Sequence, residues 1–394
     1  MRIAFISDTH FGFGRSTERS EDAWDTFEEA VARIEELECD LIVHAGDMFD
    51  TKLPRPEEWS RALRTLARLK TPLAVIHGNH ERRGKGLTNP VEGLAQGGHF
   101  DYINANHKLY EFGGARVAVH GIGWVPEAYA RDVLQHWNPK PVEGAFNILV
   151  MHQSIHPFIF NPIEPPSIRL EDLPAGFDLY VDGHIHEHQV TTAHGKPFMI
   201  VGSTVTTQVN KAEASGGKSF VVVEVDGAKT NIQTVPLLSA RRVFYKEIEI
   251  NDRPPQETKK LVEAYVEDVL KQRFDRKPLI RVRVKGRLPK GVSFSDTNLK
   301  DLRDAYAEKC ILSIGSRLSE ESFGRHVLQE IREQRLSLDE LGFKLLREFL
   351  KQQKSGFRFE DVFEHLVEGD AEATLVTLLA EKREQMERPM GVPA

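Results

Sequence analysis

The chain has 394 residues, of which 40% are hydrophobic and 28% charged, and its formal net charge is −7 at pH 7. This length can bury a large core and allows two or three domains. The acidic balance excludes a uniformly basic nucleic-acid binder. Two cysteines, Cys39 and Cys310, cannot form a disulfide framework, and the first residues contain no signal peptide or membrane span. We therefore expect a reducing, cytoplasmic location.

Charge and histidine are both unevenly distributed along the chain. Residues 241–290 contain 15 Lys or Arg against 8 Asp or Glu, whereas the segments on either side are acidic. In contrast, 14 of the 16 histidines lie within the first 194 residues. Histidine chemistry is therefore expected early in the chain, and a basic surface in the segment after residue 240.

Residues 1–240 alternate between strand-like and helix-like segments. Helical spacing of apolar residues predicts helices at 20–37, 57–69 and 127–137. Short apolar runs predict strands at 3–6, 41–44, 73–76, 100–103, 109–112, 117–120, 147–151, 177–181, 198–201, 220–225 and 230–235. This order fits an α/β/β/α sandwich, with two packed mixed sheets and outer helices. The polar loop at 205–218, which ends in Gly216-Gly217, is expected to be mobile.

The composition changes near residue 241. Strands predicted at 243–250 and 279–288, and helices at 254–273 and 295–309, make a small α/β domain at 241–318. Residues 319–388 are predicted to be helical.

Five of the predicted strands are followed at once by polar residues. These are Asp8 and His10; Gly46-Asp47; Gly78-Asn79-His80; His152; and Gly183-His184 with His186. The carboxyl ends of strands are where α/β sheets place their chemistry. Each motif alone is weak, because turn residues and core histidines are common. Their repetition at five strand ends is specific.

In this order the motifs resemble the signature of the calcineurin-like metallophosphoesterases. The resemblance implies two metal ions, one held by Asp8, His10, Asp47 and His186, the other by Asn79, His152, His184 and the bridging Asp47. Mixed carboxylate, imidazole and amide ligands suit manganese, iron or zinc, and magnesium is possible. Two ions about 3.5–4 Å apart can activate water and clamp the attacking and leaving oxygens of a phosphoryl displacement.

The same resemblance gives His80 a catalytic role rather than a ligand role. Its imidazolium would neutralise developing charge or protonate the leaving oxygen. Asp50 and His120 are expected to support the ligands without binding metal, and His44 and His77 are expected to be supporting or core residues.

Within this wider family, residues 1–240 resemble one group more specifically, the SbcD/Mre-eleven DNA double-strand-break repair nucleases. The resemblance lies in residues 1–14, 46–50, 78–81, 152–153, 182–186 and 202–204. This implies a manganese-dependent DNA exonuclease and endonuclease at the nucleoid. Its expected partner is an SMC-like ABC ATPase of the SbcC/Rad type, in a complex of two nuclease and two ATPase chains. Asp50 stands where several members have a histidine, and residues 205–208 where bacterial members have an Arg. Strand geometry and polarity are therefore left open.

The segment at 279–287 alternates apolar and basic residues, which puts Arg281, Arg283 and Lys285 on one strand face, with Arg287 beyond them. This face is either a DNA phosphate-binding surface or simply a solvated strand face, and a neighbouring nuclease site favours DNA. The resemblance makes residues 241–318 a capping domain. The apolar stripes of residues 319–388 either pack on one another or, as the resemblance implies, bind the ATPase.

Two other functions remain open at this stage. A small-molecule (cyclic nucleotide) phosphodiesterase would use the same metal site but leave the basic strand unexplained. A catalytically silent scaffold would tolerate degenerate ligand positions, yet every ligand position is filled.

Overall fold

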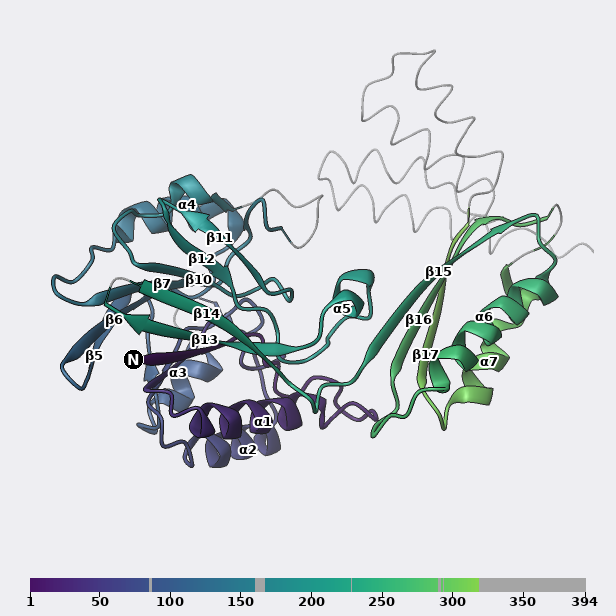
Figure 1. Cartoon of the computed structure of the whole chain (residues 1–394), viewed down its shortest axis with the longest axis horizontal. Helices are drawn as coiled ribbons and strands as arrows, with labels where there is room; N and C mark the ends of the chain where they lie inside the picture. The colour runs from purple at the N-terminus through teal and green to yellow at the C-terminus, as the bar shows by residue number, and fades with distance from the viewer. Residues whose placement is uncertain (85–86, 160–166, 228, 290–291, 293, 319–394) are drawn as a thin grey trace, which may run out of the picture. The chain divides into compact units, whose positions relative to one another are not determined.

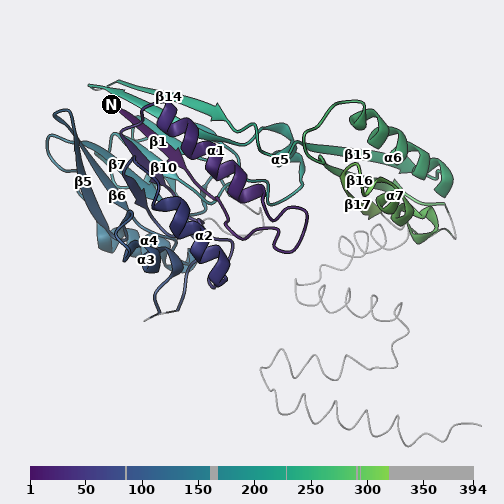
Figure 2. The same ribbon diagram turned by 90° about the horizontal axis from the view of Figure 1, so that it is seen from below.

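The structure is a computed structural model, which describes residues 1–84, 87–159, 167–227, 229–289, 292 and 294–318. Two six-stranded sheets, a three-stranded sheet and a two-stranded pair are present in these ranges (Figures 1 and 2). No helix within these ranges is long and apolar enough to cross a lipid bilayer.

The first sheet contains the amino-terminal strand. Its order is β14 (Lys229–Pro236), β13 (Ser219–Asp226), β1 (Arg2–Ile6), β2 (Leu41–His44), β3 (Leu73–Val75) and β4 (Asp101–Tyr102). Strands β1 to β4 are parallel, and β13 is antiparallel to both β1 and β14. The outer face is covered by α1 (Asp22–Glu36), α2 (Pro56–Leu66) and α3 (Pro90–Ala95), whose apolar side chains form one core cluster with this sheet.

The second sheet has the order β11 (Gln189–Ala193), β12 (Lys196–Ile200), β10 (Leu179–Asp182), β7 (Phe146–Met151), β6 (Ala115–Gly121) and β5 (Asn106–Phe112). Strands β12, β10, β7 and β6 are parallel, and the edge strands β11 and β5 are antiparallel to their neighbours. Helix α4 (Glu127–Trp137) contributes to the core on the outer face. The pair β8 (Ile155–His156) and β9 (Ile168–Arg169) is followed by the 3-10 helix η1 (Leu170–Asp172).

Side chains alternate between the two faces of each strand, and this alternation forms the two core layers. In β1, Ile3 and Phe5 lie in the core cluster that the two sheets share, whereas Ala4 and Ile6 lie in the cluster beneath the helices. Successive side chains of a strand point to opposite faces, so one strand supplies both cores. The predicted α/β/β/α sandwich is confirmed.

The three-stranded sheet is built from residues after 240. It consists of β15 (Val243–Asn251), β16 (Leu279–Arg287) and β17 (Ile311–Leu318), with α6 (Pro255–Leu270), the 3-10 helix η2 (Phe294–Thr297) and α7 (Leu299–Tyr306) between them. Helices α6 and α7 lie along one face of this sheet (Figure 1). Ile280, Val282 and Val284 of the central strand are fully buried.

Several details differ from the sequence predictions. The loop predicted at 205–218 contains helix α5 (Lys211–Ser215), which begins where the side chain of Asn210 accepts a hydrogen bond from Glu213 N at 2.9 Å. Strands β11 and β17 and helix α3 were not predicted, because each is short or rich in polar residues. The predicted helix at 295–309 is divided into η2 and α7.

Clustering of contacts gives two compact units. The first contains Met1–Glu249, Pro254–Val284 and Ser293–Ser316, and the second includes Ile250–Arg253 and Lys285–Val292. The domain boundaries expected from the sequence therefore stay predictions, and the helical element predicted at 319–388 lies outside the described residues.

Candidate metal centre

Five loops carry the predicted ligands, and all five follow the carboxyl ends of parallel strands. Strands β1, β2 and β3 are neighbours in the first sheet, and β7 and β10 are neighbours in the second. Adjacent parallel strands end on the same edge of a sheet, so the loops of each sheet meet there.

The backbone at these loop residues is unusual. Four of the seven predicted ligands have left-handed conformations, with φ of 51° at Asp8, 47° at His10, 51° at Asp47 and 69° at His184. Non-glycine residues rarely adopt positive φ, and such conformations concentrate at functional sites, where surrounding contacts hold them.

The first group of ligand atoms comes from β1 and β10. His10 Nε2 and His186 Nε2 lie 3.3 Å apart, and Asp8 Oδ1 lies 3.5 Å from His186 Nε2 and 3.9 Å from His10 Nε2. Asp8 Oδ1 is buried without a hydrogen-bond partner in the described part of the chain. A buried carboxylate oxygen facing two imidazole nitrogens is the arrangement expected where a cation binds.

The second group comes from β2, β3, β7 and β10. Asn79 Oδ1 lies 3.1 Å from His152 Nε2 and 3.0 Å from His184 Nδ1, and His152 Nε2 lies 3.3 Å from Asp47 Oδ2. Asp47 also lies within 4.8 Å of ligand atoms of His10 and Asp8. It is therefore placed to contact both groups.

These spacings fit metal ions. Ligands about 2.1 Å from a common ion stand roughly 3.0 Å apart at octahedral angles and roughly 3.4 Å apart at tetrahedral angles. The closest separations in both groups, between 3.0 and 3.5 Å, match this range. The residues present therefore fit the metal pair that the sequence implies.

Protonated histidines offset the negative charge of the carboxylates in this cluster. Burial raises the pKa of Asp8, but the contact with His186 and the charge of the nearby histidines lower it further, to about 2. Burial also raises the pKa of Asp47, but His152 holds this pKa well below its usual range. Burial lowers the pKa of His152 and His186, but Asp47 raises the first to about 10, and Asp8 and Glu213 raise the second to about 9. A cation would replace these protons.

Two of the imidazoles that face the cluster through Nε2 are held from behind at Nδ1: His152 Nδ1 contacts Ala45 O at 2.7 Å, and His186 Nδ1 lies 3.2 Å from Glu213 Oε1. His10 Nδ1 lies 3.3 Å from Asp50 Oδ1, but without the geometry of a hydrogen bond. An oxygen acceptor at Nδ1 fixes the tautomer that leaves the Nε2 lone pair available to a metal.

His80 lies at the edge of this cluster and is partly exposed. Its backbone N–H donates to Asp47 Oδ1 at 2.9 Å, and its Nδ1 lies 2.8 Å from Asp50 O. His80 Nε2 is 4.0 Å from Asp47 Oδ2, and a ring nitrogen of His80 lies within 4.8 Å of ligand atoms of His10 and Asp47. Asp50 therefore contacts both His10 and His80.

His120 is not in this cluster. It is buried, and its side chain contacts Asn147 Oδ1 at 3.2 Å and packs on His107 and Phe177. Asn147 lies near the amino end of β7, whereas His152 follows the carboxyl end. The expectation that His120 supports a metal ligand is therefore wrong.

Three other buried groups join the ligand loops. His44 Nε2 lies 3.1 Å from Thr9 Oγ1, and its Nδ1 accepts from Gly46 N at 3.3 Å, whereas His77 Nδ1 contacts Tyr102 OH at 2.8 Å. Glu81, whose role sequence reasoning missed, accepts from Phe49 N at 2.7 Å and Gly78 N at 2.9 Å. The position of Glu81 directly after His80 is the one sequence feature that could have indicated this role.

The cluster opens into a pocket of about 1040 Å³. His10, Asp47, Asn79, His80, His184 and His186 line its polar side, and Phe13, Trp124 and Pro126 add apolar surface. A pocket with a charged floor and partly apolar walls can admit a phosphate ester with an attached organic group.

The basic strand β16 has the predicted alternation. Arg281, Arg283 and Lys285 are partly exposed on the face opposite the buried apolar residues. Arg281 donates to Ser313 Oγ, and Arg287 forms an ion pair with Asp252. Three further cations of the basic segment contact the first domain: Arg241 pairs with Asp22 at 2.7 Å, Arg276 with Asp25 at 2.6 Å and Lys277 with Glu18 at 2.9 Å. Part of the positive charge is therefore already paired.

Comparisons with known proteins agree with this geometry. A family model described as calcineurin-like phosphoesterase matches residues 1–188, which contain all seven predicted ligands and His80. Three proteins named DNA double-strand break repair protein Mre11 are similar to the chain. The one from Thermoplasma acidophilum is 27% identical over 71% of this chain and 76% of the relative. The one from Sulfolobus acidocaldarius is 26% identical over 77% and 80%.

The third relative, from Methanopyrus kandleri, is 29% identical over 57% of this chain, and the match spans about half of that protein, 54%. The matched family model, the similarity to Mre11 proteins and the convergent ligand cluster point to one conclusion. Together they support a metal-dependent phosphoesterase of the Mre11 type.

Proposed function

We propose that this chain is a two-metal, manganese-dependent DNA nuclease that hydrolyses phosphodiester bonds in double-strand-break repair, as exonuclease and endonuclease. The observation that carries the proposal is the convergence of seven ligand side chains from five strand ends around Asp47. The names of the similar proteins support the repair role.

Each residue of the cluster has a part in this proposal. Asp8, His10 and His186 would hold one ion, Asn79, His152 and His184 would hold the other, and Asp47 would contribute to both sites. When bound, the ions would supply an activated water and neutralise phosphate charge. Asp50 orients His10 and His80 through the contacts at their Nδ1 atoms.

His80 is the proposed general acid. Its Nδ1–H donates to Asp50 O, and in the imidazolium form its Nε2–H, which faces the pocket, would give a proton to the leaving oxygen. A group that serves the transition state rather than the metals should affect turnover more than metal content.

DNA is the proposed substrate because of the basic strand. Arg281, Arg283, Lys285 and Arg287 would contact phosphates without reading sequence. The domain at 241–318 would then cap the nuclease domain at 1–240. The helical element at 319–388 would bind an SMC-like ABC ATPase of the SbcC/Rad type, and the nuclease would form a homodimer within a two-plus-two complex at the nucleoid.

One experiment separates this function from a small-molecule (cyclic nucleotide) phosphodiesterase of the same fold. Purified chain is incubated with end-labelled duplex DNA, with and without Mn²⁺, at low and high salt, and in parallel with a cyclic nucleotide. Metal-dependent DNA degradation that weakens with salt supports the nuclease. Hydrolysis of the cyclic nucleotide with no degradation of DNA supports the alternative, and inactivity of a metal-loaded chain on both contradicts both.

A further inference from the structure

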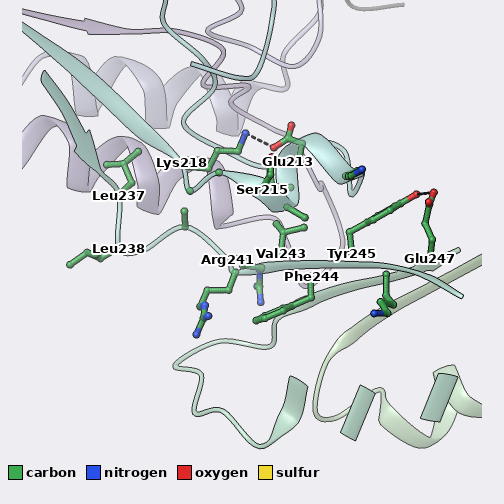
Figure 3. Close-up of a pocket in the computed structure, with 18 of the residues that line it drawn as sticks. Glu213, Ser215, Lys218, Leu237, Leu238, Arg241, Val243, Phe244, Tyr245 and Glu247 are labelled. Atoms are coloured by element: carbon green, nitrogen blue, oxygen red, sulfur yellow. Dashed lines mark hydrogen bonds and ion pairs between the residues drawn. The ribbon is translucent and has the colours of Figure 1, made fainter. Parts of the chain in front are cut away.

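The loop after β12 contains a buried charge pair that no role described so far requires. Glu213 on α5 and Lys218, five residues later, form an ion pair, and both side chains are almost fully buried at 5% and 6% exposure. Figure 3 shows the two side chains pointing toward each other at the edge of a pocket. Burying two charges is costly, and a buried pair is weak evidence for stability on its own.

The lysine is fixed on both sides. Lys218 Nζ donates to Ser203 Oγ at 2.6 Å, and Ser203 Oγ in turn donates to Val205 O at 2.9 Å. Lys218 Nζ also lies 3.5 Å from His186 O. An ammonium held by these partners fixes the position of the Glu213 carboxylate with which it pairs.

The carboxylate is directed at a proposed metal ligand. Glu213 Oε1 lies 3.2 Å from His186 Nδ1, the nitrogen on the opposite side of the ring from the metal cluster. Thr207 Oγ1 also lies 3.0 Å from Nδ1. A hydroxyl can donate or accept, so Thr207 alone does not fix the tautomer. A carboxylate can only accept, so it requires a proton on Nδ1 and leaves the Nε2 lone pair for a metal.

We infer that Glu213 is the positioning residue for His186, that Lys218 holds Glu213 in place, and that the pair sets the affinity of the site for the metal ion that His186 binds. This inference rests on the proposed function, since it assumes the metal pair. The three histidines then differ in how they are held at Nδ1. His152 contacts a neutral carbonyl and His186 contacts a buried carboxylate with its own cation, whereas His10 lies beside a partly exposed carboxylate without a hydrogen bond at Nδ1 in the described part of the chain.

The test compares metal binding by full-length variants that separate positioning from packing. Glu213→Gln keeps the shape but removes the charge, and leaves Lys218 buried without its carboxylate. The double variant Glu213→Gln/Lys218→Met removes both charges together, which relieves the buried lysine. Asp22→Asn is the matched control, because Asp22 is equally buried and pairs with Arg19 and Arg241, away from the ligands.

Binding of Mn²⁺ is followed by equilibrium dialysis with metal analysis, and by electron paramagnetic resonance, which distinguishes coupled ion pairs from single ions. Circular dichroism confirms folding of each variant. Wild type and Asp22→Asn should take up two ions and give the coupled signal. Glu213→Gln and the double variant should each bind one ion roughly 10–100-fold more weakly. The coupled signal should then give way to that of a single ion.

The outcomes distinguish the two proposals. Two ions bound with wild-type affinity by the folded double variant would overturn the role of Glu213 and leave the nuclease proposal standing. Failure of the wild-type chain to bind an ion pair would overturn the metal centre itself, and both proposals with it.

Discussion

Asp47 Oδ1 accepts a hydrogen bond from the backbone N–H of His80 at 2.9 Å, while Asp47 Oδ2 faces His152 Nε2 at 3.3 Å. The loop after β3 therefore holds the residue that is proposed to contact both ions. This contact requires the loop to pass very close to Asp47. A Cβ atom on Gly78 would lie only 2.1 Å from Asp47 Oδ1.

Gly78→Ala is therefore expected to displace Asp47 and disrupt the metal centre. Overpacking costs about 1–3 kcal/mol of stability, and a shift of about 1 Å in a catalytic group can lower turnover by roughly 100-fold. Bound Mn²⁺ and nuclease activity should both fall. Gly84→Ala is the matched control, because nothing lies within 4 Å of a Cβ there. Full metal content in Gly78→Ala would show that the loop tolerates the methyl group.

His80→Ala should separate metal binding from catalysis. The side chain is partly exposed and lies at the rim of the cluster, so its removal leaves both ligand groups intact. Turnover should fall by roughly 10²–10⁴, the usual contribution of a general acid, while metal analysis still finds two ions. Asn79→Ala, at the neighbouring position, should instead lose metal. Empty metal sites in His80→Ala would show that His80 is a ligand.

The sequence predicted the sandwich and the convergence of the ligand loops for one physical reason. Each ligand follows closely after a short apolar strand, as Asp47 follows β2 and His152 follows β7. The sequence pattern that predicts the strand therefore also predicts the position of the ligand. The alternation in β16 was predictable in the same way.

The supporting residues could not be predicted in this way. Glu213 reaches His186 only because α5 folds back on the loop after β10, a long-range contact with no local pattern. His120 ends an apolar run just as a ligand would, yet its side chain turns toward Asn147. Strand-end position predicts where a residue lies, and tertiary packing decides which way its side chain points.

Metal affinity should rise with pH. The pKa of His152 is raised to about 10 and that of His186 to about 9, so both rings are protonated at neutral pH before metal binds. Each ion must displace a proton, so below these values the apparent affinity should fall about tenfold per pH unit for each proton released. Calorimetry of Mn²⁺ binding in buffers of different ionisation enthalpy at pH 7 measures this release. Binding with no proton release would contradict the protonated cluster.

Glu81 should make the metal-free chain less stable as pH rises. Burial and the charge of Asp47 raise its pKa to about 8, although the N–H groups of Gly78 and Phe49 oppose this. Between about pH 4.5 and 8 the folded chain keeps a proton that the unfolded chain releases, so stability falls across that window. Glu81→Gln cannot ionise, but its NH2 group cannot accept from a backbone N–H as the second carboxylate oxygen does, so the variant should be less stable than wild type at pH 5.

From pH 5 to pH 8 the stability of Glu81→Gln relative to wild type should rise by on the order of 1–3 kcal/mol. Chemical denaturation of both chains in chelator at the two pH values measures the difference. The same difference between variant and wild type at both pH values would show that Glu81 is ionised throughout at little cost.

Substitutions in the basic strand β16 should weaken DNA binding to different degrees. Arg283 lies in the middle of the basic face, whereas Arg287 forms an ion pair with Asp252 and so offers less charge to a phosphate. Arg283→Ala should weaken duplex binding for all sequences and reduce the slope of log affinity against log salt by about 1. Arg287→Ala should have a smaller effect.

Lys259→Ala on α6, where Lys259 Nζ lies 3.3 Å from Asp301, is the control and should change neither quantity. Fluorescence anisotropy over a salt series measures the slopes, with Ca²⁺ in place of Mn²⁺ to suppress cleavage. Equal slopes for wild type and Arg283→Ala would show that this face of β16 is a solvated surface that does not contact DNA.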